Sequence, residues 1–524
     1  MQQQQQAINL LESGNKYSRE DQNNDTEYVN FYFDNDKILR SFFGYKTTFD
    51  NKGNAPFIKV LIDRTGNYLY LLSVDGLTII DKAFKVFSRL PFIINQDMPE
   101  HIPNESFMSI VEDVNGNVVL TSGGTAGIFL ATIERNDRNV ITNAYMEQLD
   151  YTADYQQTQI TLWNETTKKI TALFLPASVE YLDTKIIILD SYAGKFYIFT
   201  NLFTNAPSLN PNDFSIQSIP CDVVAIARVK RALCVIGTKC VEFWYSSEDS
   251  IGLSRYSNQL IESGTIFPNS VTVLNGRLLY LGCNENSSPS VTIVDFNQPN
   301  EMTIEKNNLS FFFENIETNS DVKAYNFSPS DLNFYVLNVN NRTLLIDIDS
   351  HNHTYLSETG VNRFIANDIF RFGNEWYFIS NKPAIHNMSS SISSYDGKPI
   401  PLNITTGIIR TENNEPFGIE SIDFAIRPIS AYNQDFAKQE QLKETERSLY
   451  HIYCQFSKTI GSNKDLSTEF ELRILPREIF ASSIKDSRFP QGRILLQASF
   501  RFLQPIIRNQ YLPLAIQTFN INLF

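Results

Sequence analysis

An apolar, aromatic-rich strand followed by a turn and a second apolar strand recurs along the first four hundred residues of the chain. A single β-hairpin is marginally stable in water, because one face and two edges stay unburied. Copies spaced by about 40–50 residues can bury their faces on one another, as the blades of a β-propeller do. The copies begin at Gly66, Gly116, Lys185, Arg231, Gly276, Leu332 and Gly373, at intervals of 50, 69, 46, 45, 56 and 41 residues. The repeat therefore predicts an all-β fold with a β-propeller of six or seven blades.

Changes in composition and residue pattern along the sequence divide the chain into three parts. Residues 1–27 are rich in Gln and Asn, which predicts a flexible, polar N-terminal arm or one that a partner orders. Residues 28–409 are predicted to form the propeller, and the aromatic segment Tyr28–Phe49 is a candidate for closing the ring against the last blade. Residues 410–524 contain longer alternating strands, which predict a separate C-terminal β-sandwich-like domain.

The charge composition restricts the classes of partner. The net charge is −14, and direct binding to nucleic-acid phosphates requires clustered Lys and Arg that this chain lacks. Only 19% of the residues are charged, so much of the surface is expected to be polar and uncharged or covered by other subunits. No apolar run approaches the roughly 20 residues of a membrane span, and the N-terminus has no secretory pattern. We therefore expect a protein without a membrane span, made in a cytoplasm.

The cysteines are odd in number and scattered, and none forms a Cys-x-x-Cys pair. We interpret them as buried free thiols, with zinc ligands or disulfides as the alternatives. The five are Cys221, Cys234, Cys240, Cys283 and Cys454.

A search for catalytic motifs finds no nucleophile elbow, no His-Glu-x-x-His and no phosphate-binding glycine loop. His351 and His353, with Asp347 and Asp349 close by, could hold a divalent cation, but Asp-, Asn- and His-rich strings are typical of turns. The string Ser73–Thr78 is the nearest approach to a sialidase-type turn, and its Asp-Gly step is typical of a hairpin. We predict no enzyme, and assign no catalytic, cofactor-binding or metal-binding residue and no cofactor.

The tryptophans and the known propeller repeats give little further guidance. The Gly-His and Trp-Asp signatures of WD40 repeats are absent. Trp163, Trp244 and Trp376 lie in apolar strand contexts, which predicts core packing for each.

Several segments resemble one protein family. They are Ile38–Gly44 with the following Tyr45–Asp50, the block Val223–Ser246 with Gly237, Val241, Glu242 and Phe243, the pieces Ile261–Gly264 and Asn275–Val294, and Gly492–Phe502. Together they resemble the packaged-DNA stabilisation proteins, also called tail accessory factors or tail hubs, of short-tailed bacteriophages. The family has proline where this chain has Phe43, and this chain is somewhat longer, with a polar N-terminal arm and a larger insertion before Lys185.

The resemblance implies a structural virion protein that forms a ring, expected to be a hexamer, in the tail. Its implied partners are the portal and adaptor proteins of the head-to-tail connector and the tail needle, fibre or spike proteins. Such a hub retains packaged DNA and encloses it without sequence-specific binding, as part of the ejection conduit. The acidic composition agrees, because like charge keeps a duplex from sticking to the wall. Assembly is expected in the cytoplasm of the host bacterium.

A second class of function stays open from the residues. A carbohydrate-binding or carbohydrate-active propeller in receptor recognition would carry aromatic and carboxylate side chains at one mouth. The chain has only 3 Trp, a residue usually prominent in sugar sites, which favours the hub. A propeller scaffold for host proteins is a third option.

Overall fold

The computed structural model describes residues 6–9, 26–93, 104–123, 127–149, 151–152, 170–171, 175–200, 202–203, 208–209, 214–247, 252–282, 289–298, 301–308, 316–317, 319–409, 415–426, 450–457, 469–474, 482–493, 495–507 and 510–523. In these ranges the regular structure is β-strand, apart from the short 3-10 helices η1 (Glu105–Phe107) and η2 (Pro268–Ser270). The expected all-β class is therefore confirmed. No helix of the described residues is long and apolar enough to cross a membrane.

The chain forms two compact units. Unit 1 consists of Met1–Lys46, Ser328–Ile365 and Asn387–Phe524, and unit 2 of Thr47–Phe327 and Ala366–His386. Each is described by itself below.

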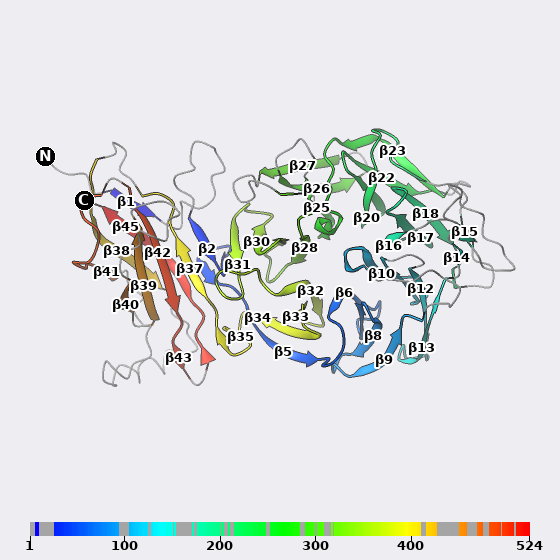
Figure 1. The fold of residues 1–524 in the computed structure, drawn as a ribbon, viewed down its shortest axis with the longest axis horizontal. Helices are drawn as coiled ribbons and strands as arrows, with labels where there is room; N and C mark the ends of the chain where they lie inside the picture. The colour runs from blue at the N-terminus through cyan, green and yellow to red at the C-terminus, as the bar shows by residue number, and fades with distance from the viewer. Residues whose placement is uncertain are drawn as a thin grey trace. The chain divides into compact units, whose positions relative to one another are not determined.

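Unit 2 contains five four-stranded antiparallel sheets, each formed by consecutive strands (Figure 1). The first sheet is β6 (Phe57–Ile62), β7 (Tyr68–Ser73), β8 (Gly76–Asp81) and β9 (Val86–Pro91). The second is β10 (Met108–Glu112), β11 (Val118–Ser122), β12 (Ile128–Arg135) and β13 (Ile141–Gln148). The third is β16 (Pro176–Leu182), β17 (Lys185–Asp190), β18 (Lys195–Thr200) and β19 (Ser208–Leu209).

The fourth sheet is β20 (Val223–Val229), β21 (Ala232–Gly237), β22 (Val241–Ser246) and β23 (Leu253–Ile261). The fifth is β24 (Thr272–Leu274), β25 (Arg277–Gly282), β26 (Ser290–Gln298) and β27 (Glu301–Asn308). Unit 2 also holds β28 (Val322–Phe327), β32 (Ala366–Phe372), β33 (Glu375–Ser380) and the start of β34 (Ala384–Ser389), with a short pair of β14 (Tyr151–Thr152) and β15 (Ile170–Thr171). In these sheets the repeated segments of the sequence are the paired central strands, such as β7 with β8 and β21 with β22.

The first strands of the sheets follow one another in a closed order. Contacts connect β6 to β10, β10 to β16, β16 to β20, β20 to β24, β24 to β28, β28 to β32, and β32 back to β6. Figure 1 shows these strands around a common centre, with the later strands of each sheet farther out. This circular order is the arrangement of a β-propeller.

The two ends of unit 2 meet at one place in the ring. Asn51 donates its N–H to the carbonyl of Pro383 at 2.7 Å. The hydroxyl of Thr47 lies 3.0 Å from Nδ1 of His386. The strand β5 (Gly44–Asp50) thus brings the beginning of unit 2 against its last strand. The aromatic segment after Tyr28 therefore contributes its final residues to closure of the ring.

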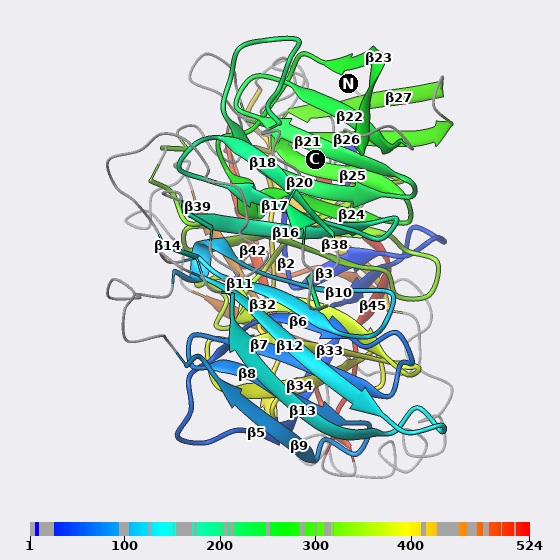
Figure 2. The same ribbon diagram turned by 90° about the vertical axis from the view of Figure 1, so that its right-hand side faces the viewer.

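Central strands are buried on both faces because neighbouring sheets cover each side. Along β7, Tyr70 and Leu72 pack in a cluster that includes Phe129 of the next sheet. The alternate residues Leu69 and Leu71 pack in a second cluster, which contains residues of β32 and β33. In β17 the same alternation separates Ile186 and Ile188 from Ile187 and Leu189. Figure 2 shows the sheets containing β17 and β21 side by side. Since successive side chains of a strand point to opposite faces, continuous apolar runs serve two interfaces here.

The Asp-Gly step of Ser73–Thr78 is a tight hairpin turn. Ser73 pairs with Gly76, so only two residues connect β7 to β8. Gly76 has φ +137°, and a Cβ there would lie 2.2 Å from the carbonyl oxygen of Leu90. Glycine is required for both reasons, and the interpretation as an ordinary turn holds.

Unit 1 contains two sheets. One follows the order β29 (Phe334–Val339), β30 (Arg342–Asp347), β31 (His353–Leu356), β2 (Glu27–Val29), β37 (Leu402–Thr405), β42 (Gln497–Leu503), β39 (Tyr450–Ser457) and β40 (Phe470–Ile474). The other follows β3 (Phe31–Phe33), β4 (Leu39–Ser41), β45 (Ala515–Leu523), β38 (Ile419–Ile426) and β41 (Ser482–Ile484), with β1 (Gln6–Asn9) also on β45. Short strands are β35 (Ser394–Tyr395), β36 (Lys398–Pro399), β43 (Ile506–Ile507) and β44 (Gln510–Tyr511).

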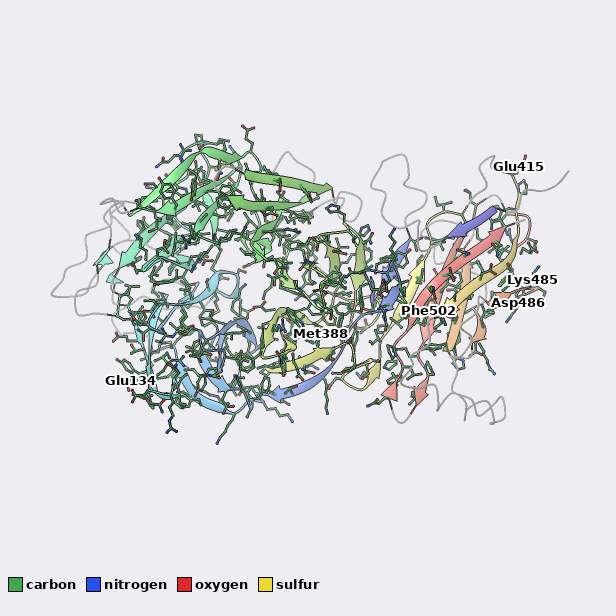
Figure 3. The ribbon with its side chains drawn as sticks, turned by 180° about the vertical axis from the view of Figure 1, so that it is seen from behind. Glu134, Met388, Glu415, Lys485, Asp486 and Phe502 are labelled. Atoms are coloured by element: carbon green, nitrogen blue, oxygen red, sulfur yellow. The ribbon has the colours of Figure 1, made fainter. Side chains whose placement is uncertain are left out.

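Aromatic side chains join the two sheets of unit 1. The ring of Phe519 on β45 lies 4.8 Å from that of Phe500 and 6.3 Å from that of Phe502, both on β42. The ring of Phe31 on β3 lies 6.0 Å from that of Phe502. Figure 3 labels Phe502. The edge-on geometry of these three contacts is favourable for aromatic pairs.

The N-terminal part of the chain is integrated into unit 1. In the predicted arm 1–27, Gln6–Asn9 pair antiparallel with β45, while residues 1–5 and 10–25 lie outside the described ranges. Gly44, in a family-like segment, approaches the backbone closely, because a Cβ there would lie 2.4 Å from the carbonyl oxygen of Ile392. The C-terminal strand β45 lies between β4 and β38.

Candidate functional site

The first strands β6, β10, β16, β20 and β24 of unit 2 line a partly open cavity of about 290 Å³ at the centre of the ring. Its lining comes from β6, η1, β10, β16, β20, η2 and β24. Three charged side chains line it, namely Lys59, Glu180 and Arg228. Several small polar residues add hydroxyl and amide groups, among them Ser109, Ser178, Asn269 and Thr272. A cavity with few convergent polar groups is the usual form of a ligand site, so it is the candidate site of this fold.

The innermost strands are held together by side chains. The hydroxyl of Ser109 accepts the N–H of Val179 at 3.3 Å, which joins β10 to β16. The amide of Asn326 donates to the hydroxyl of Thr272 at 2.9 Å and to the carbonyl of Val273 at 2.8 Å, which joins β28 to β24. Buried or half-buried backbone groups need such partners at sheet edges. The polar residues of the inner ring therefore have a structural role.

The charges of the inner ring lie in partly desolvated surroundings. Burial raises the pKa of Glu180 to about 7, although the N–H and guanidinium of Arg228 favour the charged carboxylate. Burial and the neighbouring Lys59 lower the pKa of Lys323 to about 8. Burial likewise raises the pKa of Asp368, against the attraction of Lys59 and Lys323. Both signs of charge are thus distributed around the ring.

The lining does not assemble a catalytic pair. Among the described residues that line the cavity there are serines but neither histidine nor cysteine, so a serine has no imidazole base beside it. In the described ranges no group of three or more His, Cys, Asp or Glu side chains is placed to hold a metal ion. The cavity can accept a small polar molecule or water.

The candidate cation residues form a turn. Asp347 accepts the N–H of Asp349 at 3.0 Å and the hydroxyl of Ser350 at 2.6 Å, and the carboxylate of Asp349 accepts from Asn333 at 2.7 Å. His351 has φ +59°, as in a left-handed turn. Burial lowers the pKa of His353 to about 3, so its imidazole is neutral. This agrees with the interpretation of the string as a turn.

The tryptophans in the described ranges pack against aromatic rings. Trp244 is buried, with its ring 5.6 Å from that of Phe196 and 5.9 Å from that of Phe214. Trp376 lies edge-on to Phe327 at 5.0 Å. Trp163 lies outside the described residues.

Glu242, a residue of the family-like block, anchors a neighbouring segment. Its carboxylate is fully buried and accepts the backbone N–H of Gln217 at 3.1 Å and of Ser218 at 2.7 Å. The guanidinium of Arg255 lies 3.2 Å from the same oxygen. The residue therefore fixes the chain before β20, a role that its motif alone did not reveal.

A second buried ion cluster joins the first two sheets. Asp63 follows β6, Glu112 ends β10 and Arg135 ends β12. The guanidinium of Arg135 lies 3.0 Å from the carboxylate of Asp63 and donates to the hydroxyl of Tyr70 at 2.8 Å. Glu112 is 3.9 Å from the same guanidinium, and burial raises the pKa of Glu112 to about 7. The neighbouring Glu134 is exposed and points outward (Figure 3). Sequence inspection gave no signal for this cluster, because its members come from separate strand ends.

The circular order of sheets and the central cavity define a β-propeller protein. The chain belongs to the family of phage stabilisation proteins described as bacteriophage P22 Gp10, beta-propeller, which it matches over residues 57–392. It is accordingly a phage structural protein with a β-propeller, consistent with a virion component and with a role other than catalysis. The family suggested by the sequence segments is thus confirmed.

Comparison with solved structures gives partial matches at low sequence identity. The β-propeller domain of Cps50 (Swd1) from Myceliophteria thermophila is 10% identical, with a TM-score of 0.42, covering 66% of this chain and 99% of that one. The WD40 domain of Pan2 from Neurospora crassa is 11% identical, with a TM-score of 0.37, covering 64% and 89%. The extracellular domain of the putative hybrid two component system BT4673 from B. thetaiotaomicron is 8% identical, with a TM-score of 0.41, covering 94% and 62%. Comparison with curated proteins gives no match.

Proposed function

We propose that this protein is a ring-forming hub of a short phage tail, which connects the portal and adaptor to the distal tail parts. It retains packaged DNA and forms part of the conduit through which the genome is ejected. The observation that carries the proposal is the family match over residues 57–392. Its partners are further copies of itself, in a hexameric ring, the head-to-tail connector and the needle, fibre or spike proteins.

The physical character of the chain supports this role. A net charge of −14 suits a wall that encloses DNA without holding it, since like charges repel. A charged fraction of 19% suits a subunit with large neighbour interfaces, because interface cores are depleted in charge. The central strands are buried on both faces, which gives each subunit the rigidity that a mechanical ring needs.

The number of blades and the sandwich-like part belong to the same proposal. We assign seven blades to the propeller, one for each of the first strands β6, β10, β16, β20, β24, β28 and β32. The sheets of unit 1 that meet through Phe519 and Phe502 correspond to the sandwich-like part.

The test is the mass and shape of the purified protein, by light scattering and negative-stain electron microscopy, with and without the cognate portal–adaptor complex. A closed ring, alone or on the adaptor, is the expected result. A particle that stays monomeric with the adaptor and binds glycans would overturn the proposal in favour of the carbohydrate-binding alternative.

A further inference from the structure

Two of the scattered cysteines meet in unit 2. The sulfur atoms of Cys221 and Cys240 lie 3.6 Å apart, although the two residues are 19 positions apart in the chain. Cys240 is fully buried in the turn between β21 and β22, whereas Cys221 is partly exposed just before β20. Both are free thiols in the structure. The two sulfurs need to approach by roughly 1.5 Å to reach the bonding distance of a disulfide.

Backbone contacts hold the two cysteines in register. Val223 pairs with Gly237 at the end of the β20–β21 ladder. Asp222, next to Cys221, accepts the N–H of Thr238 at 3.1 Å. Gly237 donates its N–H to the carbonyl of Cys240 at 2.8 Å, which closes the turn. The backbone beside each thiol is therefore held in place, which keeps the two sulfur atoms close to one another.

The buried Glu242 strengthens this arrangement. Its carboxylate binds the backbone of Gln217 and Ser218, in the segment that leads to Cys221. The guanidinium of Arg255 also donates to the hydroxyl of Ser218. The segment is therefore already held against β22 before any covalent bond forms.

We propose that Cys221 and Cys240 form an intramolecular disulfide when the protein meets a low-molecular-weight disulfide such as oxidised glutathione. This bond makes the junction of the segment 214–222 with the β21–β22 turn covalent, and it needs no part of the proposed tail role.

The two thiols have different parts in the reaction. Burial and the neighbouring Cys221 raise the pKa of Cys240 to about 12, so Cys240 is protonated at neutral pH. The more accessible Cys221, as its thiolate, attacks the glutathione disulfide, forming a mixed disulfide and releasing one glutathione thiolate. Cys240 then gives up its proton and attacks the sulfur of Cys221, releasing the second glutathione. Two protein thiols are oxidised, and one glutathione disulfide is reduced to two glutathiones.

The test uses the wild-type chain before and after incubation with oxidised glutathione. Thiols titrated in denaturant should fall from five to three, with the mass of two hydrogen atoms lost and no dimer on a non-reducing gel. Trypsin cuts after Lys195, Arg228, Lys239 and Arg255, so Cys221, Cys234 and Cys240 fall in separate peptides. The non-reduced digest should contain the peptide 196–228 linked to the peptide 240–255, and reductant should separate them.

Two variants show which thiols are lost on oxidation. Cys221→Ser should keep all four of its remaining thiols after oxidation, whereas the matched control Cys454→Ala, whose site is buried in unit 1, should fall from four to two. Five thiols persisting in the oxidised wild type, a link that involves Cys234, or a disulfide between two chains would each overturn the inference. The wild-type peptide map decides the matter even if a variant folds poorly.

Discussion

The ion cluster between the first two sheets gives the sharpest test of the packing. Changing Arg135 to Met removes the 3.0 Å contact with Asp63 and the bond to Tyr70. The side chains of Arg135 and Asp63 are 6% and 0% exposed, so water cannot replace the lost partner. Breaking a buried pair from one side costs about 3–5 kcal/mol, and we expect the lower end. The matched variant Arg138→Met, at an exposed turn position of the same sheet, should cost less than about 0.5 kcal/mol.

We expect the lower end of this range of destabilisation because the carboxylate of Asp63 keeps other hydrogen-bond donors. Its carboxylate accepts the backbone N–H of Asn67 and of Tyr68, each at 2.7 Å. A loss of about 3 kcal/mol corresponds to about a hundredfold greater population of the open state, at about 1.4 kcal/mol per tenfold. Hydrogen exchange with mass spectrometry should show this as faster exchange in peptides of β6, β10 and β12, since exchange reports local opening.

A second variant separates charge from packing. Adding Asp63→Asn to Arg135→Met removes the uncompensated carboxylate, so the double variant should exchange more slowly than Arg135→Met alone. The reasoning is refuted if Arg135→Met exchanges at the same rate as Arg138→Met, or if the double variant shows the summed cost of both changes.

Three further predictions concern single carboxylates and glycines. Burial raises the pKa of Glu112 from 4.5 to about 7, so between these pH values the native protein keeps a proton that the unfolded chain has released. The free energy of unfolding should therefore fall as the pH rises through this range. In urea unfolding between about pH 5 and about pH 8, Glu112→Gln should make this fall smaller. Glu242→Ala leaves two backbone N–H groups and a guanidinium without their acceptor and should destabilise by about 3 kcal/mol in urea unfolding, whereas the exposed control Glu262→Ala should change little. Gly44→Ala places a Cβ 2.4 Å from a carbonyl oxygen and should lower the thermal midpoint clearly more than the control Gly373→Ala. At Gly373 no atom lies within 4 Å of the added Cβ, and only the positive φ of +63° costs about 1 kcal/mol. Equal shifts of the midpoint for both variants would contradict the argument from close approach.

The local pattern of the sequence predicted the sheets well. In segments such as β7 and β21, apolar and aromatic side chains alternate between two neighbours, and this burial on both faces produces the continuous apolar runs seen in the sequence. The Asp-Gly turn at Gly76 could also be predicted, because a two-residue hairpin turn depends on residues that are adjacent in the sequence. Repeats therefore gave the propeller class directly.

Long-range polar contacts could not be predicted in this way. Asn30 is buried with φ +60°, donates to the carbonyls of Ser357 and Pro401, and accepts the N–H of Ser357. Its partners lie more than 300 residues away, and an isolated Asn resembles any other turn residue. The central cavity was missed for a similar reason, since side chains such as Lys59 and Glu180 meet only when separate sheets close into a ring.

The position of β45 has a consequence for biosynthesis. The backbone N–H of Leu514 binds the hydroxyl of Ser41 across 473 residues, and β4 pairs with β45. A ribosome adding about 5–20 residues per second exposes β4 for tens of seconds before its partner strand exists. Unit 2, whose sheets are built from consecutive strands, can complete its inner packing during that time. The edge of β4 that binds β45 is thus without this partner strand during the interval between the synthesis of the two strands.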